Sequence, residues 1–278
     1  MAQSQDISRH IALKVSLRVA YGSFLAIVVL FIVVPIGVVM LTSLSPTPYV
    51  DLPPQGVSLR WWVEAMRPEW LSPIVLSLRI AFVSAIVATI LGGSAAFAMV
   101  RGRIPGKSAL ESFIATPIIL PEIVAGVALL QVIALLGAQG ILGFRALVVA
   151  HVMVGIPYAA RTVGVSLAGI RPEWEQAAAD LGANKRNVLR YITLPLMKNG
   201  LFAGLVFAFI VSFNNVPLSV FLGRAGSQTI PIRILNYMEF RFDPALSAVA
   251  MLTAVIVLIP ILLAARMTNI MQFLYKTE

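Results

Sequence analysis

Cysteine is absent from this chain of 278 residues, and histidine occurs only twice. Without thiols the chain can form neither a disulfide framework nor a thiolate metal site. Charge is scarce as well, since Asp, Glu, Lys and Arg make up 12% of the residues, against about 25% in ordinary soluble domains. Hydrophobic residues make up 59%. A single soluble core cannot bury that much apolar surface, so the composition indicates a protein of the lipid bilayer.

Long apolar stretches between charged residues divide the chain, and about 20 apolar residues are enough to cross a membrane as a helix. Five gaps between charged residues are long enough, and a sixth stretch is interrupted only by His151 and Arg161. We therefore predict an all-α, polytopic membrane protein with about six transmembrane helices in a single domain covering residues 1–278. The predicted spans lie near residues 22–44, 75–99, 111–136, 146–168, 200–222 and 246–267.

The net charge of +9 is explained by the concentration of Lys and Arg on the cytoplasmic side of membrane proteins. If the N-terminus is inside, cytoplasmic segments hold 14 of the 21 basic residues and outer segments hold six. The remaining one, Arg79, lies inside a predicted span. We therefore expect both termini in the cytoplasm, and the basic charge requires no nucleic acid partner.

We expect neither catalysis nor nucleotide binding from this chain. His151 and Ser166 suggest an intramembrane hydrolase, but on one helix they would lie about 22 Å apart, beyond hydrogen-bond reach. The segment from Gly102 to Ser108 has three residues between its glycines, whereas a phosphate-binding loop requires four. The chain is therefore predicted not to be an enzyme.

The longest predicted cytoplasmic loop, residues 169–199, has the pattern of two short helices. Pro172 suits the first residue of a helix, and Gly182 suits the position just past its end. Asn184 suits the N-cap of a second helix that ends near Pro195. An apolar face at helical spacing is formed by Trp174, Ala177, Ala178 and Leu181. Such a pair of helices either presents a docking surface to a partner or lies on the lipid interface.

The spacing within this loop resembles a known signature. It reads Gln176-Ala177-Ala178, three residues, Gly182, nine residues, and Ile192-Thr193-Leu194-Pro195. This is similar to the loop of the permease subunits of type I ABC importers, which reads Glu-Ala-Ala, three residues, Gly, nine residues, Ile, one residue, Leu-Pro. The resemblance covers most of the chain and points in particular to the second permease of polyamine-type and phosphonate-type importers.

In that family the loop docks into a separate ATPase subunit and transmits its closure to the spans, which the resemblance implies here. One position departs from the signature, because Gln176 stands where the family has glutamate and Glu175 is displaced by one residue. One residue is about 100° of helix rotation, so Glu175 is not expected to face the neighbour of the signature glutamate. The coupling residues implied by the resemblance are Glu175, Gln176, Ala177, Ala178, Asp180, Gly182, Arg186, Ile192, Leu194 and Pro195.

The resemblance also implies an assembly and a place in the cell. The chain would be a permease forming half of a solute pathway in a bacterial inner membrane, beside a second permease that is a different chain rather than a copy. ABC ATPase subunits and an outer solute-binding protein would complete the importer. This chain would bind no cofactor, because ATP and Mg²⁺ belong to the ATPase.

Three polar residues within the predicted spans are candidates for lining the pathway. Glu122 lies about twelve residues into the third span, and Asn214 and Asn215 lie in the fifth. A carboxylate inside a span is costly and is a functional hypothesis by default.

The solute is expected to be a small polar organic molecule of the polyamine, phosphonate or amino-acid-like type. The amides of Asn214 and Asn215 stand where polyamine-type relatives often carry acids, which favours a solute that is anionic, zwitterionic or only weakly cationic. A polyamine stays open as an alternative, because such importers take their specificity chiefly from the binding protein.

Two other classes of membrane protein stay open at this point. A secondary transporter coupled to protons or ions would also use a carboxylate such as Glu122, but it would require no ATPase. A scaffold or assembly protein would show no transport. ATPase-dependent uptake separates the importer from both.

Overall fold

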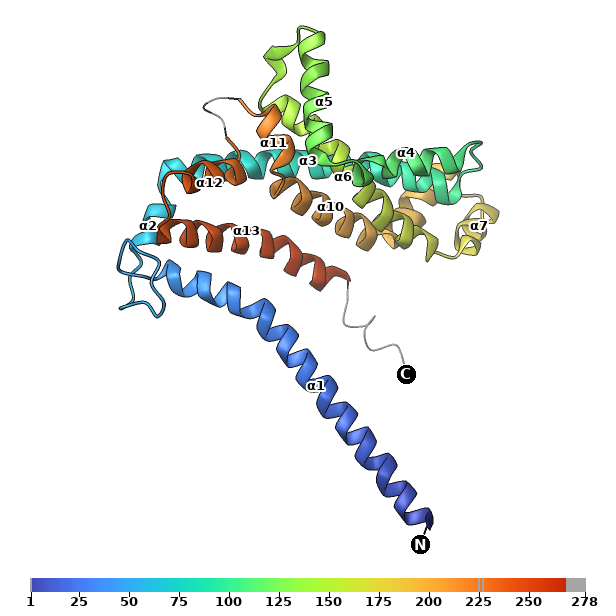
Figure 1. The fold of residues 1–278 in the computed structure, drawn as a ribbon. Helices are drawn as coiled ribbons and strands as arrows, with labels where there is room; N and C mark the ends of the chain where they lie inside the picture. The colour runs from blue at the N-terminus through green and yellow to red at the C-terminus, as the bar shows by residue number, and fades with distance from the viewer. Residues whose placement is uncertain (1, 225, 227, 269–278) are drawn as a thin grey trace. The chain divides into compact units, whose positions relative to one another are not determined.

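The structure is a computed structural model that describes residues 2–224, 226 and 228–268. Within these ranges the secondary-structure elements are all helices (Figure 1). Four helices are long and apolar enough to cross a membrane. Two bent pairs, Lys107–Ile119 with Glu122–Leu135 at 101° and Lys185–Leu196 with Lys198–Phe213 at 66°, bring the number to six if each pair is one span. The prediction of an all-α polytopic protein with about six spans is confirmed.

Four of the predicted spans lie within single long helices. These are α1 (Ala2–Ser43), α3 (Pro68–Arg101), α6 (Phe144–Ala168) and α13 (Pro244–Thr268). The apolar part of α1 begins at Leu17, and none of its most apolar window is buried. Such a helix presents its side chains to lipid or to a neighbouring protein.

The third predicted span, 111–136, is divided into two helices in the structure. It consists of α4 (Lys107–Ile119) and α5 (Glu122–Leu135), which meet at an angle of 101°. Pro121 explains the break, because a proline disfavours helical backbone at the residue before it. Leu120 is extended accordingly, with φ −73° and ψ 135°.

The fifth predicted span, 200–222, is also divided. Helix α10 (Lys198–Phe213) stops before the two asparagines, and a separate short helix, α11 (Pro217–Leu222), follows. Pro217 is the first residue of α11, where its missing N–H costs no hydrogen bond. Both interrupted spans therefore have a non-helical break next to a proline.

One compact unit is formed by the described residues up to Ala65 together with Phe242–Leu252. It contains α1, α2 (Arg60–Ala65) and the start of α13. The Thr42 hydroxyl donates to Ser247 Oγ at 2.9 Å, and the indole of Trp62 donates to Ser43 Oγ at 3.3 Å. These bonds join the end of α1 to the start of α13 and to α2. The prediction of a single domain stays a prediction.

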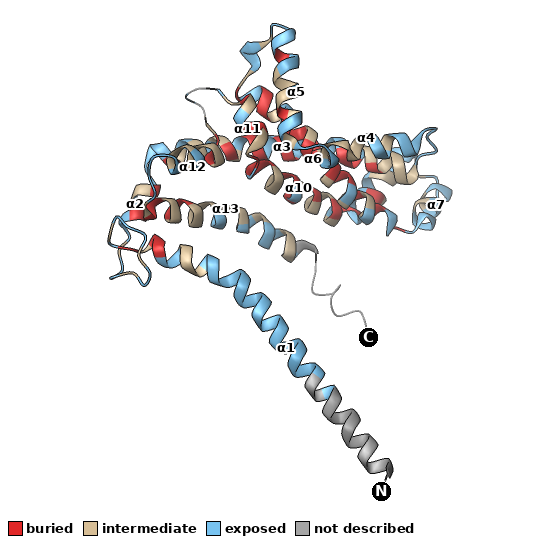
Figure 2. Cartoon of the chain, viewed as in Figure 1, coloured by how far each residue is buried: buried red, intermediate tan, exposed pale blue. Residues whose placement is uncertain are grey.

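The second unit runs from Met66 to Arg241 and includes the described residues from Thr253 onward. Its buried residues are concentrated on α3, α6 and α10 (Figure 2). Small residues let these helices approach closely: a Cβ added to Gly155 would lie 2.9 Å from Ala88 Cβ and 3.3 Å from Ala208 Cβ. The three helices form the tightly packed body that carries the sites described below.

The remaining helices complete this unit. A short 3₁₀ helix, η1 (Gln139–Ile141), precedes α6, and α12 (Ile230–Met238) packs on α3. The backbone N–H of Ile230 donates to Ser77 Oγ at 2.8 Å, which ties the start of α12 to α3. The Trp70 and Tyr237 rings lie 5.0 Å apart at a tilted angle. Aromatic pairs of this geometry stabilise a contact beyond their buried area.

We predict that Gly92→Ala destabilises the protein although alanine is the better helix former. The added Cβ would lie 2.6 Å from the Ile156 carbonyl oxygen and 2.9 Å from Ala160 N, both backbone atoms of α6. Overpacking costs about 1–3 kcal/mol, which exceeds the gain of up to ~1 kcal/mol in helix propensity. Thermal unfolding in detergent should show a lower midpoint. Gly140→Ala, whose Cβ meets nothing within 4 Å, is the control, and equal midpoints would contradict the close packing.

Candidate functional site

The first half of the predicted coupling loop forms α7 (Pro172–Asp180), with Pro172 as its first residue. Gly182 follows the helix with φ +89°. The N–H of Gly182 donates to Ala179 O at 2.9 Å, and the N–H of Ala183 donates to Ala178 O at 3.0 Å. This is the two-bond termination that a glycine in the left-handed region permits. The predicted start and end of the helix are both confirmed.

The second half of the loop begins at Asn184, whose side chain accepts from Asn187 N at 2.9 Å as an N-cap. Helix α8 (Lys185–Val188) is followed by a π-helical turn, η2 (Leu189–Thr193), and by α9 (Leu194–Leu196). Pro195 accounts for the widened turn, because it has no N–H for the carbonyl four residues earlier. Single π turns are frequent at functional sites, and the sequence did not predict this one.

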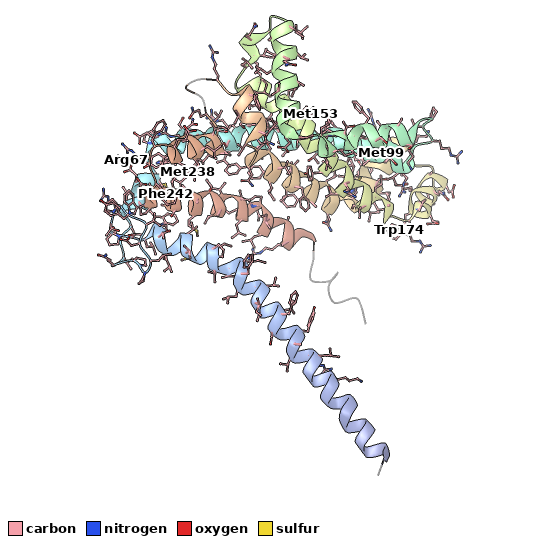
Figure 3. The ribbon with its side chains drawn as sticks, viewed as in Figure 1. Arg67, Met99, Met153, Trp174, Met238 and Phe242 are labelled. Carbon is pink, nitrogen blue, oxygen red and sulfur yellow. The ribbon has the colours of Figure 1, made fainter. Side chains whose placement is uncertain are left out.

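The predicted apolar face of α7 is solvent-exposed in the chain. Trp174, labelled in Figure 3, is 49% exposed and Leu181 is 91% exposed. On the second half, Tyr191, Leu194 and Leu196 are exposed as well. Exposed apolar residues gathered on one segment mark a site for another protein or for lipid. The segment from α7 to α9 is therefore a candidate docking surface.

The predicted coupling residues all lie on this segment. Glu175, Ala178 and Ile192 are half-buried against the rest of the unit. The others are exposed and so available to a partner: Gln176, Ala177, Asp180, Gly182, Arg186, Leu194 and Pro195.

Glu175 has partners that the sequence did not predict. Its Oε2 accepts from Arg101 Nε at 2.8 Å, and its Oε1 accepts from Thr193 Oγ1 at 2.8 Å. Arg101 also donates through Nη2 to the Ile170 carbonyl at 2.8 Å. Because Arg101 ends α3, this ion pair connects residues 74 positions apart. No local pattern in the sequence indicates it.

The two broken spans meet at a second polar cluster. Asn215 Nδ2 donates to Glu122 Oε2 at 2.9 Å, and Asn215 Oδ1 accepts from Leu218 N at 3.0 Å. The Asn215 carbonyl also accepts from Ser219 Oγ at 2.9 Å. Asn215 thus holds the start of α11 and the carboxylate at the start of α5 with one side chain.

The three predicted pathway residues differ in their exposure. Asn215 is 5% exposed, Glu122 is half-buried and Asn214 is exposed. The positive end of a helix favours a carboxylate in its first turn, where Glu122 lies on α5. Glu122 and Asn214 are therefore accessible from outside the protein interior, and the buried Asn215 holds Glu122 through one hydrogen bond.

One polar pair in the core was missed by the sequence analysis. His151 Nδ1 lies 2.8 Å from Ser212 Oγ, and both residues are buried. The hydrogen bond joins α6 to α10, so His151 has a structural partner on another helix. In the part of the chain that the structure describes, no group of three or more His, Cys, Asp or Glu residues is placed to hold a metal ion.

Comparison with known proteins gives a consistent result. A family model described as "Binding-protein-dependent transport system inner membrane component" matches residues 88–272. The "Spermidine/putrescine transport system permease protein PotC" of Haemophilus influenzae is 30% identical over 249 residues, covering 89% of this chain and 96% of that protein. The "Putrescine transport system permease protein PotI" of Escherichia coli K12 is 32% identical over 203 residues, covering 71% and 72%.

Solved structures share the fold at lower identity. A chain in the crystal structure of a bacterial alginate ABC transporter, complexed with an alginate pentasaccharide-bound periplasmic protein, matches with a TM-score of 0.66 and 15% identity. The match covers 91% of this chain and 94% of that chain. A chain of the inward-facing MetNI methionine ABC transporter matches with a TM-score of 0.60 and 18% identity, covering 73% and 98%.

Proposed function

Because the chain belongs to the family of binding-protein-dependent transport system inner membrane components, we propose that the segment from α7 to α9 is the surface on which an ATPase docks. The chain is a multi-pass permease subunit of an ABC importer in the inner membrane, and it is not an enzyme. An ATPase, a solute-binding protein and a second permease belong to such an importer. Support for the docking site comes from the exposed Trp174 and Leu181 beside the left-handed turn at Gly182.

The finer organisation is also a proposal. Both termini lie in the cytoplasm, as the excess of basic residues on that side supports. ATP and Mg²⁺ bind to the ATPase, and the second permease is a different chain. Co-purification tests the last point, since a tagged copy should not retain an untagged copy of this chain from the same membrane.

The cluster at Glu122 supports a small organic amine as the solute. Its carboxylate accepts from Asn215, and a negative charge within a span favours a cationic solute, because an uncompensated carboxylate in a membrane is costly. Relatives at 30% and 32% identity are named as spermidine/putrescine and putrescine permeases. These two observations shift the preference from the anionic or zwitterionic solute, which the amides favoured, to a polyamine.

Calorimetry on the solute-binding protein encoded beside this gene tests the solute class directly. We expect binding of putrescine or spermidine with micromolar or tighter affinity. Tight binding of a phosphonate or an amino acid, with no response to either polyamine, would return the preference to the solute expected from the amides.

We predict that cysteines at Ala179 or Arg186 can be cross-linked to the ATPase. Both residues are exposed on the proposed docking surface, and the chain has no cysteine of its own. Tyr49→Cys is the control, because Tyr49 is exposed and lies in the segment after α1, which the charge distribution places outside. It should react with a membrane-impermeant thiol reagent and give no ATPase adduct. Labelling of Arg186→Cys from outside would contradict the orientation.

A further inference from the structure

Glu175 of α7 binds Arg101 of α3 and Thr193 of η2, and Arg101 also binds the connection between α6 and α7. We propose that Arg101, Glu175 and Thr193 form an intrachain joint through which a movement of α7 is passed to α3. Glu175 is then a positioning residue that acts within this chain. The inference rests on the proposed docking of an ATPase on α7 and adds the route by which that docking reaches the spans.

Each carboxylate oxygen of Glu175 accepts one hydrogen bond within the joint. One oxygen of Glu175 accepts from Arg101 at the end of α3, and the other accepts from Thr193 at the end of η2, both at 2.8 Å. The second bond of Arg101, to the Ile170 carbonyl at 2.8 Å, includes the connection between α6 and α7. A guanidinium that uses two nitrogens on two fixed acceptors is held in one orientation. The joint therefore fixes α7 relative to three neighbouring segments.

Burial distinguishes this ion pair from the exposed pair formed by Lys107 and Glu111. The side chains of Arg101 and Glu175 are 16% and 17% exposed, whereas those of Lys107 and Glu111 are 51% and 54% exposed at a separation of 3.9 Å. Exposed pairs contribute little because water and salt screen them. Thr193 is 1% exposed, so the joint lies under the surface segment.

An apolar cluster continues the joint into the membrane-spanning body. Ile170 and Met197 belong to this cluster, which also includes Ala96 of α3 and Val163 and Leu167 of α6. Tightly packed interiors transmit displacement, since they have no free volume in which to absorb it. A displacement of α7 that the ion pair passes to Arg101 would move the end of α3 as a unit with this cluster.

The two faces of α7 differ in exposure, as a joint between a partner and the body of the chain requires. Glu175 is half-buried toward the body, while the neighbouring Trp174 and Gln176 are exposed. The carboxylate next to the signature position therefore binds inside the chain, and the exposed side of the helix is left for the partner. The displaced glutamate, Glu175, therefore has an intrachain role that the sequence alone does not indicate.

Glu175→Gln in the assembled importer tests the joint. The amide has no negative charge and one acceptor oxygen in place of two, so the charge-assisted bond from Arg101 is lost and both present hydrogen bonds cannot be kept on separate oxygens. We expect the complex to assemble and to hydrolyse ATP, while solute imported per ATP hydrolysed falls at least ~5-fold, the lower end of typical coupling between sites. Glu111→Gln makes the same change in the exposed pair and should keep the wild-type ratio.

The ratio of uptake to hydrolysis separates coupling from folding. An unchanged ratio in Glu175→Gln, or a proportional loss of uptake and hydrolysis, would overturn the joint. If Glu175→Gln does not assemble, Thr193→Val decides, because it removes one hydrogen bond at nearly equal volume. A lowered ratio supports the joint, and a wild-type ratio overturns it. Absence of ATP-driven uptake in the wild-type assembly would instead overturn the proposed function.

Discussion

Gly182→Val should abolish solute-stimulated ATP hydrolysis and uptake while the protein still inserts into the membrane. The glycine has φ +89°, and a Cβ added to it meets nothing within 4 Å. Space is therefore not limiting, and the whole effect comes from the backbone. A β-branched residue in the left-handed region costs about 1–3 kcal/mol, which corresponds to a roughly 5- to 150-fold shift between conformations. If the backbone leaves the left-handed region to relieve that strain, the bonds from Gly182 N to Ala179 O and from Ala183 N to Ala178 O are broken.

Uptake and ATP hydrolysis by the reconstituted complex are the measurements for Gly182→Val, with the amount of inserted protein as the reference. Gly182→Asn is the matched control, because asparagine enters the left-handed region with little strain. It should retain most of the coupling. Normal solute-stimulated hydrolysis by the Gly182→Val complex would show that the turn has no part in docking.

Glu122→Gln should lower polyamine uptake by about 10-fold or more. The amide oxygen still accepts from Asn215, so the hydrogen bond that links α5 to the start of α11 is kept and only the charge is removed. A hydrogen bond to a charged group is worth about 1.5–3 kcal/mol, and 1.4 kcal/mol is a factor of ten. Initial rates of labelled putrescine or spermidine uptake, measured at equal amounts of assembled complex, give the result.

Matched variants decide whether the loss of charge at residue 122 is what lowers polyamine uptake. Glu111→Gln removes an exposed carboxylate from α4 and should leave uptake unchanged. Asn215→Ala removes the cap of α11, a loss of about 1 kcal/mol, and should lower both stability and uptake. Asn214→Ala should affect uptake alone, because Asn214 is exposed. Wild-type uptake in Glu122→Gln and both asparagine variants would remove this cluster from the pathway.

Features that depend on neighbouring residues were predicted correctly from the sequence. The helix from Pro172, the turn at Gly182 and the cap at Asn184 each follow from the chemistry of a few adjacent positions. The spans within α3 and α6 follow from the length of their apolar stretches. In each case the relevant partner lies within a few residues along the chain, where spacing determines geometry.

Features that depend on packing were not predictable in the same way. Pro121 marks a break in the third span, but the bend angle of 101° does not follow from the sequence. Nor does the hydrogen bond between Glu122, just after the break, and Asn215. The same holds for Arg101 and Glu175, which are joined only because the fold brings the end of α3 beside the first turn of α7. Both pairs combine a charge with a partner more than 70 residues away.

The two roles that we propose, solute passage and coupling, belong to different clusters of one chain. Glu122 and Asn215 lie where two interrupted spans meet, and interrupted helices are a recurrent device for binding solutes within membranes. Glu175 lies in the first turn of α7 and binds Arg101 at the end of α3, whereas Ser77, which binds α12, lies near the start of α3. In the proposed mechanism the close packing of α3, α6 and α10 serves coupling as well as stability.

Solute uptake into proteoliposomes tests the account most directly. The complex of this chain with its second permease, its ATPase and its binding protein should take up a polyamine only when ATP is supplied on the side of α7, and dissipation of ion gradients should leave the rate unchanged. Uptake by this chain that requires a proton or ion gradient and proceeds without the ATPase would contradict the account and identify a secondary transporter.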